Sequence, residues 1–251
     1  AFFGKQHFSC CNNETRPRHT LCRGLVSFLC RRNRPSGLTE GRSDLHGHAD
    51  RFEEMLRLIS FSPQDTLYII GDVIDRGKQG IPLLRRIMDA PNMVLLKGNH
   101  EQMCLDTLGP QNRWGSKALW TQNGGSATYR ELVYRTPKQE KWAILRFLAQ
   151  CPHCLDVTVN GRQFHLVHGF PSPDPEQRLW LRPEPDAPPP FPARTAIVGH
   201  TPTCFLTGDF TSPLSVWKGN GVIDIDCGCG SDSPLSRLAC LRLDDLQVFY
   251  V

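Results

Sequence analysis

The stretch Gly71–Gly77 reads Gly-Asp-Val-Ile-Asp-Arg-Gly, and the other motifs of the chain are arranged around it. It follows the apolar run Leu67–Ile70, which predicts a buried strand, and it precedes a pattern typical of an amphipathic helix. Asp72, Asp75 and Arg76 therefore lie where a strand ends, which is the edge of an α/β sheet that binds ligands. Two carboxylates in a glycine-flanked turn suit a hard cation. Taken alone, a solvated acidic turn would explain the stretch better.

The composition is that of a soluble globular protein. The 251 residues, 39% hydrophobic and 22% charged, can form one large domain or two small ones. No apolar run approaches the roughly 18 residues of a membrane span. Residues 1–43 hold eight Lys/Arg and two acids, a charge of +6 in a chain of net charge +4, so residues 44–251 sum to −2. We therefore expect neither nucleic acid nor a membrane as a partner.

Residues 1–43 are atypical of the start of a domain. They are basic and cysteine-rich, lack a clear period, and contain one apolar patch that is too short for a secretory signal. A targeting segment, a disordered arm or an altered sequence would each fit. The eleven cysteines form no evenly spaced framework, which favours reduced thiols and a cytoplasmic location.

Two motifs flank the central stretch. Asp44 and His46 are two apart, so in an extended segment they would point the same way and could offer a carboxylate and an imidazole to one metal. The residues before Asp44 form only a weak strand pattern. A strand predicted over 93–96 delivers Gly-Asn-His-Glu, in which Asn99 is a neutral oxygen ligand and His100 a candidate proton donor. That tetrapeptide could instead cap a helix through Asn99.

The second half of the chain presents further histidines. Asn160-Gly161 predicts a hairpin between strands 155–159 and 162–167. His165 and His168 at its end are three apart and would face opposite ways, so His168 is the candidate ligand and His165 a half-buried strand residue. A strand over 196–198 then delivers His200.

The remaining patterns complete the expected secondary structure. Six prolines between 183 and 192 predict a stiff surface loop. Cys151, Cys154, Cys227 and Cys229 lack the spacing of a zinc site, so we interpret them as packing residues. Helical patterns cover 49–60, 80–90 and most of 102–150, with a capping box predicted at Thr136–Gln139, and strands are predicted over 222–225, 238–243 and 246–251.

Six nitrogen and oxygen donors lie at or near the ends of predicted strands: Asp44, His46, Asp72, Asn99, His168 and His200. Two divalent ions roughly 3.5–4 Å apart need such a set, with one carboxylate free to bridge them and a shared water as the nucleophile.

The ordered motifs D-x-H-G, G-D-x-x-D-R-G, G-N-H-E, H-G and G-H-T-P resemble the phosphoprotein phosphatase family of metallophosphoesterases over residues 44–243. The sequence looks closest to the bacterial and phage branch of serine/threonine protein phosphatases. Three stretches are similar to that branch: Trp120–Gly125, Leu179–Arg182 and Ile225–Gly228. The resemblance implies the calcineurin-like metallophosphoesterase fold, an α/β two-sheet β-sandwich flanked by helices, with the catalytic domain at 44–251.

The resemblance also implies a role for each site residue. Arg76 and Arg182 would bind the phosphate, a hydroxide bridging the ions would attack phosphorus, and His100, oriented by Asp75, would protonate the leaving alkoxide. Asn99 and His100 would also contact the substrate. Mn²⁺ is the expected metal, with Fe or Zn as alternatives. Asp44 and His46 would bind the first ion, Asp72 both ions, and Asn99, His168 and His200 the second.

Three functions are compatible with these motifs. The first is a serine/threonine protein phosphatase, and the second is a dinucleoside polyphosphate (symmetrical bis-nucleosyl tetraphosphate) hydrolase with the same metal core. The third is a non-catalytic phosphate-binding protein, which the unusual segment 1–43 favours. The intact pair Asp75 and His100 argues for an enzyme, because a binding protein needs no proton donor.

Overall fold

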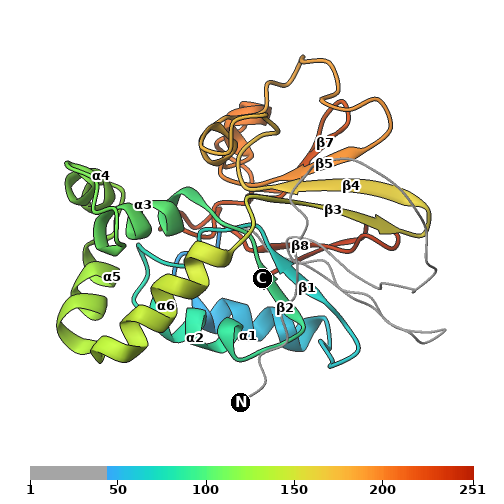
Figure 1. Ribbon diagram of the computed structural model, residues 1–251. Coiled ribbons are helices and arrows are strands. Elements are labelled where there is room, and N and C mark those ends of the chain that lie inside the picture. The colour runs from blue at the N-terminus through green and yellow to red at the C-terminus, as the bar shows by residue number, and fades with distance from the viewer. Residues whose placement is uncertain (1–43) are drawn as a thin grey trace, which may run out of the picture.

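A computed structural model gives the fold and describes residues 44–251 (Figure 1). The expectations for residues 1–43, including the weak strand before Asp44 and a disordered arm, lie outside the described residues. Of the helices in the described part, none has the length and apolar composition needed to cross a membrane.

The helices before residue 151 follow the predicted periodicities. The pattern over 49–60 forms α1, the pattern over 80–90 forms α2, and residues 102–150 are mostly helical, so these predictions are confirmed. A π-helical turn, Glu131–Arg135, and a short 3-10 helix, Gln177–Leu179, complete the helical elements. The α-helices are α1 (Ala49–Leu58), α2 (Gly80–Met88), α3 (Asn99–Leu108), α4 (Ser116–Gln122), α5 (Ser126–Arg130), α6 (Lys138–Gln150) and α7 (Cys204–Thr207).

Apart from the short strand Trp217–Lys218, which was not predicted, the strands also lie where alternating or apolar runs predict them. Asn160 and Gly161 both have positive φ and close the β3–β4 hairpin, and residues 183–192 form a loop. The strands are β1 (Leu67–Ile69), β2 (Met93–Leu95), β3 (Cys154–Val159), β4 (Arg162–Val167), β5 (Thr195–Val198), β6 (Trp217–Lys218), β7 (Val222–Asp224), β8 (Ala239–Leu241) and β9 (Val248–Tyr250).

The strands form the two layers of the expected sandwich. One layer is a five-stranded sheet in the order β3-β4-β5-β7-β6, and the other contains the parallel pair β1-β2 and the antiparallel pair β8-β9 (Figure 1). Between them lies a core with Tyr68 and Leu96 from one layer and Phe164, Ile197 and Ile223 from the other. The predicted fold class is confirmed.

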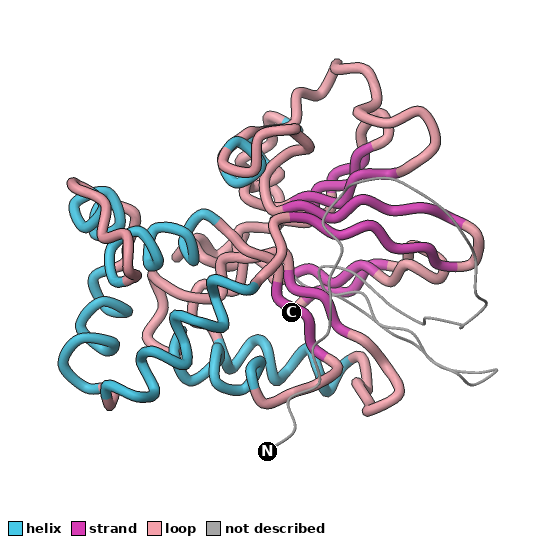
Figure 2. The backbone as a smooth tube through the Cα atoms, in the orientation of Figure 1, coloured by secondary structure: helices cyan, strands magenta, loops and turns pink. Residues whose placement is uncertain are grey.

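The helices pack on the outside of the β1-β2 layer. Figure 2 shows most of the helical chain gathered on one side and the strands on the other. Phe52, Leu84 and Leu148, from α1, α2 and α6, meet Leu67 and Leu95 of the strands in a second buried cluster. The apolar faces of these helices and of β1 and β2 therefore pack together in this cluster, which fixes where the two strands end.

One local expectation was wrong. Thr136 does not cap α6, because Pro137 occupies the N-cap position and the Thr136 hydroxyl donates to the Glu131 carbonyl at 3.0 Å. Cys227 and Cys229 are both buried, each in a different hydrophobic cluster, which agrees with their interpretation as packing residues.

Candidate metal centre

The candidate site lies where the ends of four strands meet. Asp72 follows β1, Asn99 follows β2, His168 follows β4 and His200 follows β5, and both strand pairs are parallel. The ends of β1 and β2 approach each other closely at Gly71 and Gly98. A Cβ on Gly71 would lie 2.5 Å from the Gly98 Cα, so neither position has room for a side chain. Glycine at this close approach therefore brings Asp72 and Asn99 together.

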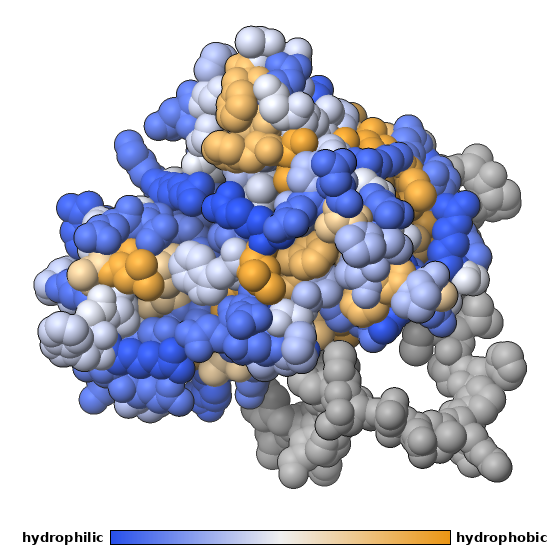
Figure 3. Space-filling view, turned by 90° about the horizontal axis from the view of Figure 1, so that it is seen from above, coloured by the Kyte–Doolittle hydropathy of each residue, from blue (hydrophilic) through white to orange (hydrophobic). Residues whose placement is uncertain are grey.

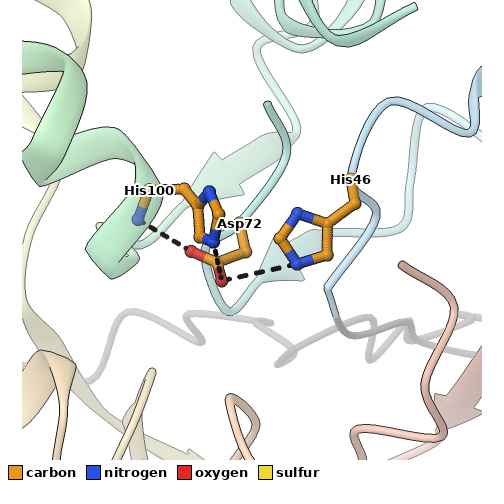
Figure 4. A group of neighbouring side chains, drawn as sticks. All are labelled: His46, Asp72 and His100. Atoms are coloured by element: carbon orange, nitrogen blue, oxygen red, sulfur yellow. Dashed lines mark hydrogen bonds and ion pairs between the residues drawn. The ribbon is translucent and has the colours of Figure 1, made fainter. Parts of the chain in front are cut away.

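Asp72 is the centre of the site. Its Oδ2 lies 3.6 Å from His46 Nε2 and 3.8 Å from His100 Nε2 (Figure 4). The same oxygen lies 3.4 Å from His168 Nε2. Burial alone would raise the pKa of this carboxyl, but the surrounding histidines, His168 first, lower it below its usual value. Asp72 is thus a buried carboxylate shared by several imidazoles.

Two histidines have the tautomer that a metal requires. The Nδ1–H of His46 donates to the Ile74 carbonyl at 3.1 Å, and that of His168 donates to the Ile70 carbonyl at 2.7 Å. Their Nε2 lone pairs consequently face Asp72. The Nε2 of His46 is buried without a hydrogen-bond partner, which is costly for a polar atom unless an electron-pair acceptor binds there.

Asn99 and His200 complete the second half of the site. The Asn99 amide lies 2.9 Å from His168 Nε2, and when its nitrogen faces the carboxylate it donates to both Asp72 oxygens at 3.1 and 3.2 Å. The His200 ring lies 5.1 Å from the His168 ring, centroid to centroid. Burial lowers the pKa of His200 to about 3, so the ring is neutral and can act as a ligand.

Asp44 is buried beside these ligands and next to another buried carboxyl, that of Asp226. Its Oδ1 accepts the His200 backbone N–H at 3.5 Å. Burial raises the pKa of both carboxyls, and the charge of Asp226 adds to the rise for Asp44. Asp226 was not among the predicted site residues; only its position in the stretch Ile225–Gly228 drew attention to it.

His100 is held by a chain of buried partners. Its Nδ1–H donates to Asp75 Oδ2 at 2.7 Å, and the indole N–H of Trp120 donates to the same oxygen at 2.6 Å. Burial alone would lower the pKa of His100, but Asp72 and the bond to Asp75 raise it above the usual value. The resulting imidazolium can donate a proton from Nε2, as the sequence predicts for an acid.

Arg76 and Arg182 are both exposed at the rim of the site. The Arg76 backbone N–H donates to the Gly124 carbonyl at 3.2 Å, which joins it to the loop after α4. Burial raises the pKa of Asp44, and the positive charge of Arg76 opposes that rise. Burial lowers the pKa of His200, and the positive charge of Arg182 lowers it further. The two guanidinium groups therefore approach the site from the sides of Asp44 and of His200.

Backbone strain is concentrated in these residues. Six of the ten non-glycine residues with positive φ in the described part are site candidates: Asp44, His46, Asp72, Asp75, Arg76 and His200. Such conformations cost on the order of 1–3 kcal/mol each and persist only where the surrounding structure enforces them. The strand-end turns thus direct the side chains inward at a cost in stability.

Glu101 connects the two central strand ends and was missed by the sequence analysis, although it stands beside His100. Its buried carboxylate accepts the N–H groups of Asp72 at 2.7 Å, Val73 at 2.9 Å and Gly98 at 3.0 Å, and that of Ile74 at 3.4 Å. Burial, followed by Asp72, raises its pKa to about 7. Glu101 is a positioning residue, because it fixes the turns that carry Asp72 and His100.

Glu101→Gln is expected to lower the free energy of unfolding by at least ~3 kcal/mol, because the new amide directs N–H groups at backbone donors that lose their acceptor. Urea unfolding followed by circular dichroism measures the loss. The control is Glu140→Gln, whose half-exposed ion pair with Arg85 should be worth less than ~1 kcal/mol. Equal effects of the two changes would contradict the role given to Glu101.

Trp120→Phe is expected to reduce turnover of a substrate with a poor leaving group by about tenfold, because Asp75 loses one of its two buried donors and holds His100 less firmly. Metal content should not change. The matched control is Trp142→Phe, at a residue that is 41% exposed on α6. Steady-state kinetics with parallel metal analysis decides; a loss of bound metal in Trp120→Phe would mean that the indole supports the ligands instead.

The residues present fit a pair of divalent ions. Two groups of described residues bring three ligand atoms within 4.8 Å of one another: His46, Asp72 and His100, and Asp72, His168 and His200. Asp72 belongs to both, as a bridging ligand would. The first group contains His100, where the sequence predicts Asp44. The Nδ1 of His100 is bound to Asp75, so its Nε2 is the atom that could either bind a metal or donate a proton.

The comparison with known families agrees with the fold and the site. The family described as calcineurin-like phosphoesterase matches residues 43–224, so the chain belongs to that family. Among curated relatives, serine/threonine-protein phosphatase 2 of Salmonella typhimurium is 32% identical over 126 residues, which are 50% of this chain and 55% of that protein. Serine/threonine-protein phosphatase 1 of the same organism is 37% identical over 149 residues, 55% of this chain and 66% of that protein.

A second kind of relative shares a shorter stretch. The symmetrical bis(5'-nucleosyl)-tetraphosphatase of Acidovorax ebreus is 43% identical over 60 residues, 23% of this chain and 21% of that protein. A solved structure described as a putative diadenosine tetraphosphatase has a TM-score of 0.58 at 16% identity, covering 86% of this chain and 94% of its own. That likeness supports the fold alone. The chain spans about half the length of the phosphatase 2 relatives it matches.

Proposed function

We propose that this protein is a metal-dependent phosphomonoester hydrolase, and specifically a serine/threonine protein phosphatase. The observation that carries the proposal is the buried series Trp120, Asp75 and His100, which directs His100 Nε2 toward the shared carboxylate of Asp72. A serine alkoxide is a poor leaving group, so its departure needs a proton donor at that position.

Two divalent ions, Mn²⁺ being the expected metal, would supply Lewis-acid stabilisation and an activated water when bound. The all-nitrogen-and-oxygen donor set suits such ions. Asp72 would hold both ions, Asp44 and His46 one of them, and Asn99, His168 and His200 the other. The buried, partnerless Nε2 of His46 supports this assignment.

The other residues act on the substrate. Arg76 and Arg182 would bind two phosphate oxygens at the rim of the site, as planar guanidinium groups do. His100 would transfer its Nε2 proton to the leaving oxygen while Asp75 stabilises the imidazolium. Asn99, beside His100, would contact the phosphate as well as a metal.

The substrate class rests on the relatives. The matches over 126 and 149 residues carry the name serine/threonine-protein phosphatase, which favours a phosphoprotein substrate. The second candidate is symmetrical hydrolysis of a dinucleoside tetraphosphate, favoured by the 43% identity over 60 residues to such an enzyme. A cytoplasmic location is supported by the free thiols of residues 44–251.

Hydrolysis of p-nitrophenyl phosphate by the purified chain tests the proposal. We expect turnover with Mn²⁺ that a chelator abolishes and added Mn²⁺ restores. A phosphoserine peptide and diadenosine tetraphosphate are then compared by kcat/KM. A higher value for the nucleotide would favour the second candidate. Metal binding and phosphate binding without any turnover would instead indicate the third function, a non-catalytic phosphate-binding protein.

A further inference from the structure

A second pocket lies on the opposite face of the five-stranded sheet from the sandwich core. It has a volume of about 730 Å³, within the usual range for ligand sites, and we call it the Arg178 pocket. His165 projects into it from β4, on the side of the strand that carries Val167 and not Phe164 or Leu166. Its lining includes the polar and aromatic residues Asp156, His165, Phe170, Arg178, Phe191 and Arg194.

One wall of the pocket is a fixed polar and aromatic arrangement. Asp156 accepts from His165 Nδ1 at 2.7 Å and from Arg194 at 2.8 Å. The Phe191 ring lies 4.8 Å from the His165 ring and 4.3 Å from the Arg194 guanidinium carbon. Burial lowers the pKa of His165, so its ring is neutral near pH 7. The single charge of Asp156 is therefore balanced by Arg194.

Arg178 supplies a positive charge that forms no ion pair with an acid of residues 44–251. Its guanidinium donates to the Ser172 carbonyl at 2.5 Å, the Pro173 carbonyl at 3.4 Å and the Cys154 sulfur at 3.4 Å. These bonds hold the side chain in place without neutralising it. The pocket thus has a net charge of +1 and walls of aromatic and proline rings, which suits a carboxylate on an extended peptide.

The pocket is close to the candidate metal centre in the chain. His165 and His168 are three residues apart on opposite faces of β4, a distance of about 10 Å at the usual strand rise. Gly169 is packed against the backbone of 178–181, and its N–H donates to the Arg178 carbonyl at 2.8 Å. The segment 178–182 therefore presents Arg178 to the pocket and Arg182 to the metal centre.

We infer that the Arg178 pocket binds an acidic side chain of the phosphoprotein substrate, about three residues from the phosphoserine. This inference rests on the proposed function, because it takes the substrate to be a peptide that spans both sites. On the face in Figure 3, hydrophobic side chains form separate groups among hydrophilic ones.

The test uses phosphoserine peptides with glutamate three residues before or after the phosphoserine, each paired with its glutamine counterpart. We expect the full chain to prefer glutamate at one of these positions by about tenfold in kcat/KM, through KM. Arg178→Met should abolish the preference and leave turnover of p-nitrophenyl phosphate unchanged. The matched control Arg162→Met removes an exposed charge of β4 outside the pocket and should keep the preference.

A charge exchange separates recognition from a structural role of Arg178. Arg178→Glu should favour a peptide with lysine at the preferred position, which a loop that is merely loosened would not do. If the variants unfold, comparing kcat/KM of the unaltered chain for the glutamate and glutamine peptides still tests the inference. Equal kcat/KM values for that pair at both positions would overturn the inference alone. Turnover of p-nitrophenyl phosphate without turnover of any phosphopeptide would overturn the proposed function as well.

Discussion

Replacing Asp72 by asparagine is expected to reduce turnover at least a thousandfold and to lower the bound metal from two ions to one or none per chain. Asp72 Oδ2 is the oxygen that lies 3.4–3.8 Å from three different imidazole nitrogens, and an amide of the same shape supplies no negative charge there. Losing the one charged ligand common to both groups should weaken both ion sites together.

Metal analysis after equilibrium dialysis, alongside p-nitrophenyl phosphate kinetics, measures both effects. Asp89→Asn is the matched control, since Asp89 is exposed at the end of α2 and should retain full activity and both ions. The isosteric change at Asp72 is not expected to disturb the fold. An Asp72→Asn variant that still holds two ions would contradict the bridging role.

His100→Asn is expected to lower kcat for a phosphoserine peptide by roughly 10²–10⁴-fold, the usual contribution of a general acid. Turnover of p-nitrophenyl phosphate should fall far less, because nitrophenolate leaves without a proton. Metal content should stay at two ions per chain. A variant that loses an ion would show that His100 is a ligand, the other role its distance to Asp72 permits.

The pH profile gives an independent readout of the same residue. Asp72 and Asp75 raise the pKa of His100 against the effect of burial, so the acid stays protonated near neutral pH and its contribution is lost as pH rises through that raised pKa. His100→Asn should remove this alkaline limb for the phosphopeptide. His153→Asn, at a half-buried histidine outside the site, should keep it. Equal phosphopeptide turnover in unaltered chain and His100→Asn would refute the acid assignment.

Much of the site could be anticipated because its residues follow strands. The apolar runs before Asp72 and Asn99 predict buried strands, and the hairpin signal at Asn160-Gly161 fixes the register that separates His165 from His168. Strand alternation was enough to assign His165 outside the site, where it bonds to Asp156. Local patterns of this kind are readable because they depend on neighbouring residues only.

Interactions between distant segments could not be anticipated in the same way. Glu101 reads as an ordinary acid after His100, yet it accepts N–H groups from residues 27 to 29 positions away. Trp120 stands 45 positions from the Asp75 carboxylate that it supports. Thr136 matches a capping box, but a carbonyl in the preceding π-helical turn competes successfully for its hydroxyl.

The sequence by itself determined the order of strands and helices, the candidate ligands and the family resemblance, because periodicity and motif spacing are properties of short stretches. Only the tertiary structure decided which groups share Asp72, which nitrogen of each histidine faces it, and that Asp44 lies beside the buried Asp226. It also revealed the Arg178 pocket, formed by segments from 154 to 194. The physical reason is that hydrogen bonding, burial and charge balance depend on which residues are brought together by packing.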